Sequence, residues 1–104
     1  MSKLFIDTSS NKEIKVSLIV NKEEKVLERK IGEQKAQVVL SMIDEILRKS
    51  SLKLKNIDGI EVNTGPGSFT GLRVGVAVAN ALGFALDIPV NGKNIEEFVE
   101  PAYE

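Results

Sequence analysis

Between Gly71 and Leu86 the chain is apolar almost without interruption, with Arg73 and Asn80 as its only polar side chains. Those two residues are seven apart and share one narrow stripe of a helix, so a helix here must be covered over most of its circumference. Small residues recur along it at strict four-residue spacing: Gly71, Gly75, Ala79 and Gly83. Each interior glycine costs about 0.5–1 kcal/mol relative to alanine, and close approach of another element would offset that cost. The fold therefore has to bring a second surface against this segment.

The composition is that of one globular domain: 104 residues, of which 42% are hydrophobic and 28% charged. The chain has no cysteine and no histidine, which excludes disulfides, thiolate metal sites and Ser-His-Asp catalysis. Its formal charge of -1 argues against nucleic-acid binding by bulk electrostatics. We predict no metal and no cofactor.

Targeting signals are also not expected. Residues 1–7 lack the long apolar core of a signal peptide. The stretch 74–86 is interrupted by Asn80 and is short for a membrane span. We expect a cytoplasmic protein without a membrane partner.

The spacing of the apolar residues changes along the chain: it is two residues in the first third and about 3.6 residues in the two helical segments that follow. Predicted strands cover 4–6, 14–20, 26–31, 57–63 and 88–90, and predicted helices cover 34–49 and the segment from a Ser68 or Thr70 cap to about 86. The continuous apolar run 4–6 indicates a strand covered on both faces, whereas the charged strand 26–31 suits an exposed edge. Asp44–Arg48 and Glu45–Lys49 have the spacing of helical ion pairs.

The predicted order, β-β-β-α-β-α-β, favours an antiparallel meander followed by crossovers onto the same sheet. The predicted fold class is therefore α/β, a mixed five-stranded sheet with packed helices, in the ribonuclease-H-like layout shared by actin-like ATPase domains. The strand order in this prediction rests on analogy. Residues 1–94 form the predicted domain, and 95–104 an acidic C-terminal tail.

A glycine-rich segment joins the fourth predicted strand to the second helix. A phosphate loop is one interpretation, since glycines and free N–H groups at a helix start hold anions. The Walker pattern fails because Leu72 follows Gly71, and the dinucleotide pattern fails because its third glycine falls one place late. A tight strand-to-helix turn is favoured.

As a longer string, Gly65-Pro66-Gly67-Ser68-Phe69-Thr70-Gly71-Leu72-Arg73-Val74-Gly75 closely resembles the signature of the TsaB (YeaZ) family. The flanks 4–9, 40–43 and 88–92 resemble that family's first strand, first helix and last strand, so the resemblance covers roughly residues 3–94. This sequence departs from the family pattern in three respects. Lys35 stands where many members have His, Ser41 stands where Pro is common, and the second domain that members usually carry is not in this sequence. The signature-loop residues are Gly65, Pro66, Gly67, Ser68, Phe69, Thr70, Gly71 and Arg73.

The resemblance implies a function without chemistry of its own. Family members support TsaD, which transfers the threonylcarbamoyl group to adenosine 37 of tRNA, while TsaE supplies ATPase activity. It implies a TsaD-like partner, a TsaE-like ATPase in the same assembly, tRNA contact only through the complex, and a homodimer in isolation. The alternatives are a homodimeric interaction protein outside this pathway and a metal-dependent ribonuclease-H-like nuclease using Asp7.

Asp7, Thr8 and Ser9 form the turn after the first strand. In ribonuclease-H-like nucleases the Asp7 position supplies a metal-binding carboxylate. Two-metal chemistry needs further carboxylates converging on the site, and the sequence offers few. We therefore favour a structural role in which Asp7 accepts N–H bonds within its own turn.

The apolar arc of the first helix, roughly 200°, is wider than a helix on a sheet requires. Both helices are thus predicted to form a partner interface, since large exposed apolar patches mark such sites. The predicted interface residues are Val39, Met42, Ile43, Ile46, Gly71, Leu72, Gly75, Val78, Ala79, Leu82 and Gly83. On this hypothesis Gly75→Leu breaks assembly and leaves a folded monomer. The alternative is tight packing of the glycine-rich helix on its own sheet.

Overall fold

The computed structural model describes residues 1–30 and 35–93. The strands are β1 (Ser2–Asp7), β2 (Glu13–Val20), β3 (Glu23–Lys30) and β4 (Gly59–Val62), the helices are α1 (Lys35–Lys49) and α2 (Phe69–Leu86), and a 3-10 turn covers Leu54–Asn56. The predicted start of the first helix and the acidic tail 95–104 lie outside the described residues. The third strand begins earlier than predicted because the turn before it uses only Asn21 and Lys22, at φ 49° and 73°.

The sheet has the order β3-β2-β1-β4. β1 and β3 each pair antiparallel with β2, and β4 pairs parallel with β1. The predicted meander and crossover are therefore confirmed, and the charged strand β3 lies at the edge.

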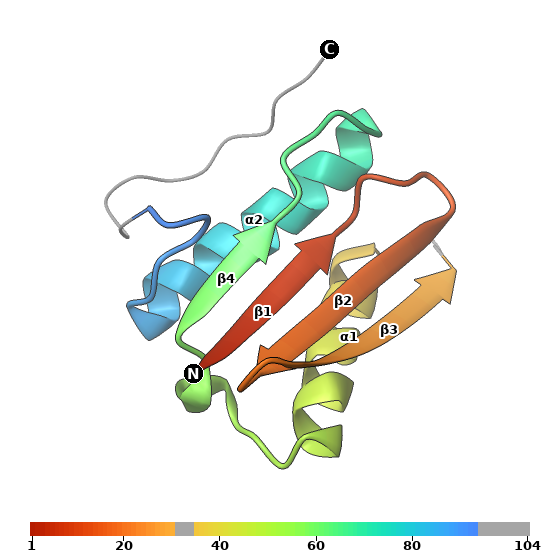
Figure 1. Cartoon of the computed structure of the whole chain (residues 1–104). Helices are drawn as coiled ribbons and strands as arrows, with labels where there is room; N and C mark the ends of the chain where they lie inside the picture. The colour runs from red at the N-terminus through yellow and green to blue at the C-terminus, as the bar shows by residue number, and fades with distance from the viewer. Residues whose placement is uncertain (31–34, 94–104) are drawn as a thin grey trace.

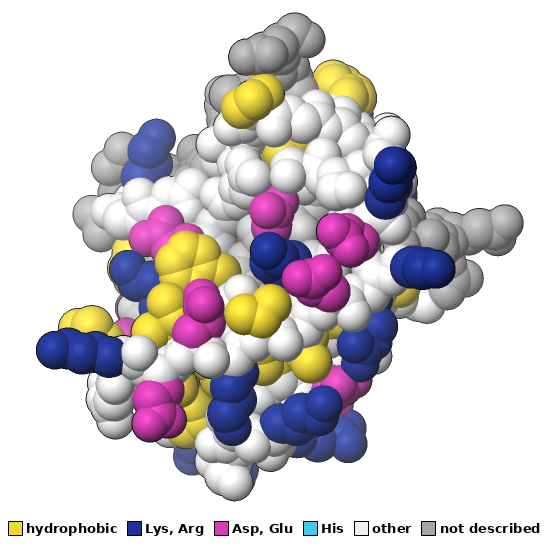
Figure 2. All heavy atoms as spheres, turned by 45° about the vertical axis from the view of Figure 1, so that its right-hand side comes forward, with side chains coloured by type: hydrophobic (Ala, Val, Ile, Leu, Met, Phe, Trp, Pro, Cys, Tyr) yellow, Lys and Arg dark blue, Asp and Glu magenta, His cyan; other side chains and the backbone are white. Residues whose placement is uncertain are grey.

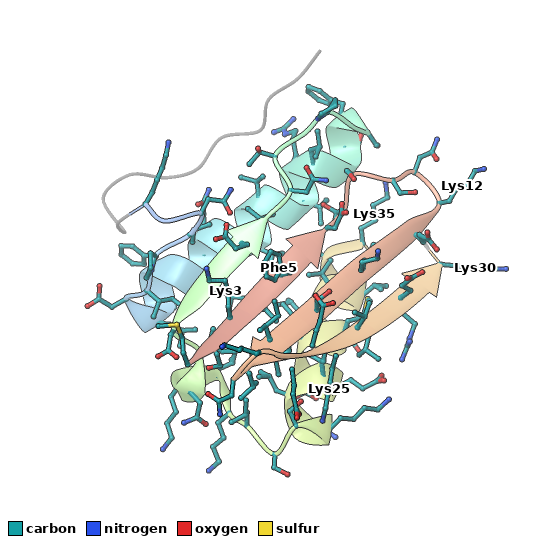
Figure 3. The ribbon with its side chains drawn as sticks, viewed as in Figure 1. Lys3, Phe5, Lys12, Lys25, Lys30 and Lys35 are labelled. Atoms are coloured by element: carbon teal, nitrogen blue, oxygen red, sulfur yellow. The ribbon has the colours of Figure 1, made fainter. Side chains whose placement is uncertain are left out.

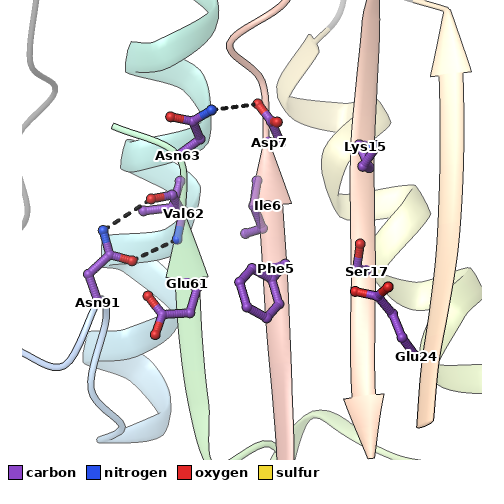
Figure 4. A pocket seen from close by; sticks show the side chains of 10 residues that line it. All are labelled: Phe5, Ile6, Asp7, Lys15, Ser17, Glu24, Glu61, Val62, Asn63 and Asn91. Carbon is purple, nitrogen blue, oxygen red and sulfur yellow. Dashed lines mark hydrogen bonds between the residues drawn. The ribbon is translucent and has the colours of Figure 1, made fainter. Parts of the chain in front are cut away.

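The predicted fifth strand is wrong: the sheet described here has four strands. Of residues 88–90, only Val90 forms a bridge, parallel to Ile60. Asn91 and Gly92 then adopt left-handed conformations, at φ 50° and 77°, which turn the chain away from β4. The Asn91 side chain replaces the next step of the ladder, since its Oδ1 accepts the Val62 N–H at 2.8 Å and its Nδ2 donates to the Val62 carbonyl at 3.0 Å (Figure 4).

Asn91→Ala is expected to lower the free energy of unfolding by about 1–3 kcal/mol, because it removes the hydrogen-bond partner of both the N–H and the carbonyl group of Val62. Urea unfolding followed by circular dichroism measures this change. Asn11→Ala, an exposed asparagine in the turn before β2, is the control and should change stability by less than about 0.5 kcal/mol. Equal effects of the two substitutions would contradict the role given to Asn91.

Both helices cover one face of the sheet, as Figure 1 shows. Leu4 and Ile6 of β1 are buried beneath them, whereas Phe5 points to the other face and is 36% exposed. The prediction that residues 4–6 are covered on both faces is therefore wrong. Successive side chains of a strand alternate between faces, and no described element lies over the second face.

α2 packs against its own chain through its small residues. A Cβ at Gly71 would meet the Thr8 carbonyl oxygen, one at Gly75 would meet the Thr8 hydroxyl, and one at Gly83 would meet Val90. Thr8 is buried, and its Oγ1 donates to the Gly71 carbonyl at 2.5 Å. The glycine spacing therefore serves close packing within the domain, which is the alternative left open by the sequence.

By length and composition alone, α2 is apolar enough to cross a membrane. Its inner face is occupied, however, since Leu72, Val76 and Ala79 are buried. The core helix of a soluble domain passes the same test.

Candidate functional site: the strand-end turn and the helical face

The turn after β1 is a small hydrogen-bonded unit around Asp7. Its Oδ1 accepts the Ser9 N–H at 3.0 Å, the Ser9 hydroxyl at 2.6 Å and the Asn63 side-chain amide at 3.3 Å. The N–H bond confirms the structural role predicted for Asp7. Among the described residues, no group of three acidic side chains lies close enough together to hold a metal ion.

The signature loop is tied to this turn. The Ser68 N–H donates to the Ser9 carbonyl at 2.8 Å, and the Gly65 N–H donates to Asn63 Oδ1 at 3.0 Å. A Cβ at Gly67 would lie 2.7 Å from the Ser9 Cβ and carbonyl oxygen. The loop therefore passes so close to the turn after β1 that any residue larger than glycine at position 67 would clash with Ser9. The peptide bond between Gly65 and Pro66 is cis.

Of the two predicted caps, Ser68 and Thr70, the structure uses Ser68: its Oγ accepts the Gly71 N–H at 3.4 Å. Phe69 and Thr70 are exposed in the first turn of the helix. The Arg73 guanidinium lies 5.6 Å from the centre of the Phe69 ring, a cation–π contact on the outer side of α2. The loop thus acts as a rigid strand-to-helix connection between the sheet and α2.

Most residues predicted to contact a partner lie in the domain's own core. The buried ones are Val39, Met42, Ile43, Ile46, Gly71, Leu72, Gly75, Ala79 and Gly83. The wide arc of α1 has a simple reason, since this helix packs on β2 and β3 and also borders α2. Buried side chains of a folded monomer cannot serve as its outer surface, so this part of the predicted interface is corrected.

Val78 and Leu82 are only partly buried and pack against the core. They are four residues apart and so share one side of α2, and Leu82 lines a groove together with Ile43 and Leu47 of α1. Leu40 of α1 is 48% exposed. Leu40 and Leu82 line a groove of about 330 Å³, which also includes Leu52 and Leu54. We call Leu40, Val78 and Leu82 the helical face; these three residues remain candidates for partner contact.

Charged groups rim the outer side of α1. Asp44–Arg48 and Glu45–Lys49 form the predicted ion pairs, at 2.5 and 3.0 Å. Glu45 also receives a two-pronged contact from Arg29 of β3, at 2.7 and 2.8 Å. Hydrogen bonds from Lys49 and then Arg29 lower the pKa of the Glu45 carboxyl. Arg29 thereby ties the edge strand to α1.

Two structural contacts next to the site were not predicted from the sequence. Asn63 links Asp7 to the glycine loop, and Asn91 continues the β4 ladder. Each asparagine follows a strand, where turn residues are common, so its position carried a signal but its partner did not.

The chain resembles known proteins over most of its length. The family model of TsaD, tRNA N6-adenosine threonylcarbamoyltransferase, matches residues 17–95. The tRNA threonylcarbamoyladenosine biosynthesis protein TsaB of Haemophilus influenzae is 45% identical over 67 residues, which are 64% of this chain and 28% of that protein.

Two solved structures extend the comparison. YeaZ from Pseudomonas aeruginosa superimposes with a TM-score of 0.80 at 32% identity, over 86% of this chain and 43% of that one. RuvC of T. thermophilus, solved with a Holliday junction, superimposes with a TM-score of 0.51 at 14% identity, over 86% of this chain and 62% of RuvC, and shows the shared fold alone. The chain spans less than half the length of the TsaB and YeaZ proteins that it matches.

Proposed function

This chain belongs to the TsaB (YeaZ) family, within the wider family of the tRNA N6-adenosine threonylcarbamoyltransferase model, and on that premise we propose that it is a non-catalytic scaffold subunit. It supports a TsaD-like catalytic subunit in threonylcarbamoyl transfer to adenosine 37 of tRNA, in the cytoplasm. A TsaE-like ATPase belongs to the same assembly, and tRNA is reached only through the complex. In isolation the chain forms a homodimer.

The observation that carries this proposal is the helical face. Leu40 is about half exposed and lies beside the groove that also contains Leu82 and Leu54. Apolar side chains that rim a groove between two helices are suited to receive a helix of another subunit. The same surface is compatible with a second copy of this chain, which explains how a homodimer and a mixed complex can be alternatives.

The signature loop has a positioning role in this proposal. The Asp7 turn and the Ser68 cap hold the start of α2, and Thr8 holds its first turns against β1. The helical face is thereby presented by a rigid support, which lowers the entropic cost of binding.

The test is the mass in solution of the purified chain, alone and mixed with the TsaD-like protein of its own organism. We expect a stable mixed complex, which Leu40→Lys weakens at least tenfold because it places a charge in an apolar contact. Val26→Lys is the matched control, since Val26 is 45% exposed on the opposite face of the sheet, and it should leave the complex intact.

Other outcomes favour other functions. A homodimer whose mass does not change when the TsaD-like protein is added would place the chain outside this pathway. A monomer under both conditions would show that the helical face has no partner. Metal-dependent cleavage of nucleic acid that disappears in Asp7→Asn would favour the nuclease alternative.

A further inference from the structure

The face of the sheet turned away from α1 and α2, which we call the open face, carries a small apolar patch. The register places Ser17 of β2 between Phe5 of β1 and Val26 of β3. Ile19, two residues further along β2, points to the same side. Phe5 is 36% exposed and Val26 45% exposed, and Figure 3 shows the Phe5 ring near the middle of the face. Covering these side chains would remove apolar surface from water and stabilise the domain.

Most charged groups around this patch are already paired within the domain. Lys3 contacts Glu61 at 3.3 Å, and Lys15 lies 3.9 Å from Glu28. The Asp7 carboxylate accepts hydrogen bonds in its own turn. The oblique view in Figure 2 shows acidic and basic side chains interleaved around small hydrophobic areas. These charges favour neither a cation nor an anion, so an occupant of the open face is expected to contribute apolar side chains.

The described chain ends at the rim of the open face. The segment 88–93 is bridged to the outer side of β4, the last strand of the sheet. Asn91 lines a groove of about 340 Å³ together with Phe5, and Gly92 lines a shallow pocket together with Lys3. The groove of the helical face, in contrast, is lined by no described residue beyond α2. The chain after residue 93 therefore begins beside the open face.

The sequence beyond residue 93 has the pattern of a short amphipathic segment. Ile95 is followed by Phe98 and Val99 at three and four positions, the spacing of one side of a helix, and glutamates occupy positions 96, 97 and 100. β1 is two strand spacings, about 10 Å, from the segment that is bridged to β4. Phe98 comes five residues after Lys93, and five residues span about 8 Å as a helix and about 17 Å when extended. Phe98 can therefore reach the middle of the open face.

We propose that residues 94–100 of the same chain dock on the open face, with Phe98 packed on Phe5 and the glutamates turned to solvent. Two phenylalanine rings in offset or edge-to-face contact add to the stabilisation from the area that they bury. Because the segment is tethered at the rim, its effective concentration is in the millimolar range and a contact of modest area is sufficient. Within residues 1–30 and 35–93 the second face of β1 is uncovered, and this contact gives it a partial cover. The contact is independent of the helical face and of the proposed scaffold function.

The test is paramagnetic broadening of amide signals in the full chain. The chain has no cysteine, so a single nitroxide spin label can be attached to the variant Glu97→Cys. Spectra of the ¹⁵N-labelled protein are recorded before and after chemical reduction of the label. We expect Phe5 and Ile19 to lose most of their signal intensity to the label, while Leu40 and Leu82 on the helical face keep theirs.

Two further variants of the spin-labelled chain identify the contact. Phe98→Ser should restore the lost intensity, because it removes the apolar side chain that packs on the patch. Glu100→Gln is the matched control and should leave the broadening unchanged, because this side chain faces solvent in the proposed arrangement. Broadening that survives Phe98→Ser, or that Glu100→Gln abolishes equally, would overturn the proposal.

A mixed sample separates the chain's own tail from that of a second copy. It contains ¹⁵N-labelled chain without a spin label and spin-labelled chain without ¹⁵N, and we expect no broadening in it. Broadening in this mixture would assign the open face to a second copy and overturn the proposal. Broadening centred on Leu40 and Leu82, or none at all, would equally overturn it. These measurements need no TsaD-like protein, so a failure of the tail contact is distinguished from a failure of the scaffold function.

Discussion

Gly71→Ala is expected to lower the free energy of unfolding by about 3 kcal/mol, the upper end of the usual cost of overpacking. The added methyl group would meet the carbonyl oxygen of Thr8, which belongs to the backbone and has little freedom to move. Alanine is otherwise the better helix former by about 1 kcal/mol, so a loss of stability reports the close approach of α2 to the β1 turn. Chemical denaturation monitored by circular dichroism measures the change.

Gly75 provides an internal control for this interpretation. There the added methyl group would meet the Thr8 side chain, and Thr8→Ala removes most of the obstructing atoms. We expect Gly75→Ala to be destabilising alone and partly rescued in the double variant, while Gly71→Ala stays unrescued by Thr8→Ala. Gly75→Leu should therefore unfold the domain and not merely block assembly. A well-folded, monomeric Gly75→Leu protein would show that the helix has room that the structure does not indicate.

Ile46→Ala is expected to cost about 2–5 kcal/mol, the range for removing a fully buried aliphatic side chain. Ile46 is 1% exposed and belongs to the core between α1 and the sheet. Because the free energy of unfolding of a small domain is only about 5–15 kcal/mol, this substitution would remove a large part of the protein's stability. Thermal and urea unfolding both measure this effect.

Leu40→Ala on the same helix is the matched control. Leu40 is 48% exposed, so we expect a loss below about 1 kcal/mol in the isolated domain and a clear loss of partner affinity. The opposite pattern, with Ile46 important for partner binding but not for stability, would restore the interface predicted from the helical arc.

Local features were predicted well from the sequence. The Ser68 cap, the end of α2 at Leu86 and the two ion pairs of α1 all depend on residues within one helical turn of each other. The charged edge strand and the Asp7 turn are equally local. Capping, turn formation and helical spacing act over a few residues, so the sequence alone contains the information needed to predict them.

The errors concern which surfaces meet. A continuous apolar run at 4–6 is consistent with a strand covered on one face or on both, and only the arrangement of α1 and α2 shows that Phe5 is uncovered. The fifth strand depended on Asn91, whose side chain takes over pairing with Val62 where the backbone turns away. Neither the uncovered face of β1 nor the Asn91–Val62 pairing can be predicted from residue spacing, because each depends on how segments far apart in the chain are arranged.

The sequence by itself determined that a nearly apolar, glycine-spaced helix must be closely covered, and its long signature placed the chain in the TsaB family. Only the tertiary structure decided what covers that helix. Thr8, Val90 and the sheet take up its small-residue face, which leaves Leu40, Val78 and Leu82 as the partly exposed helical face. The physical reason is that hydrophobic patterning states how much surface must be buried, whereas the distance between packed elements decides which atoms bury it.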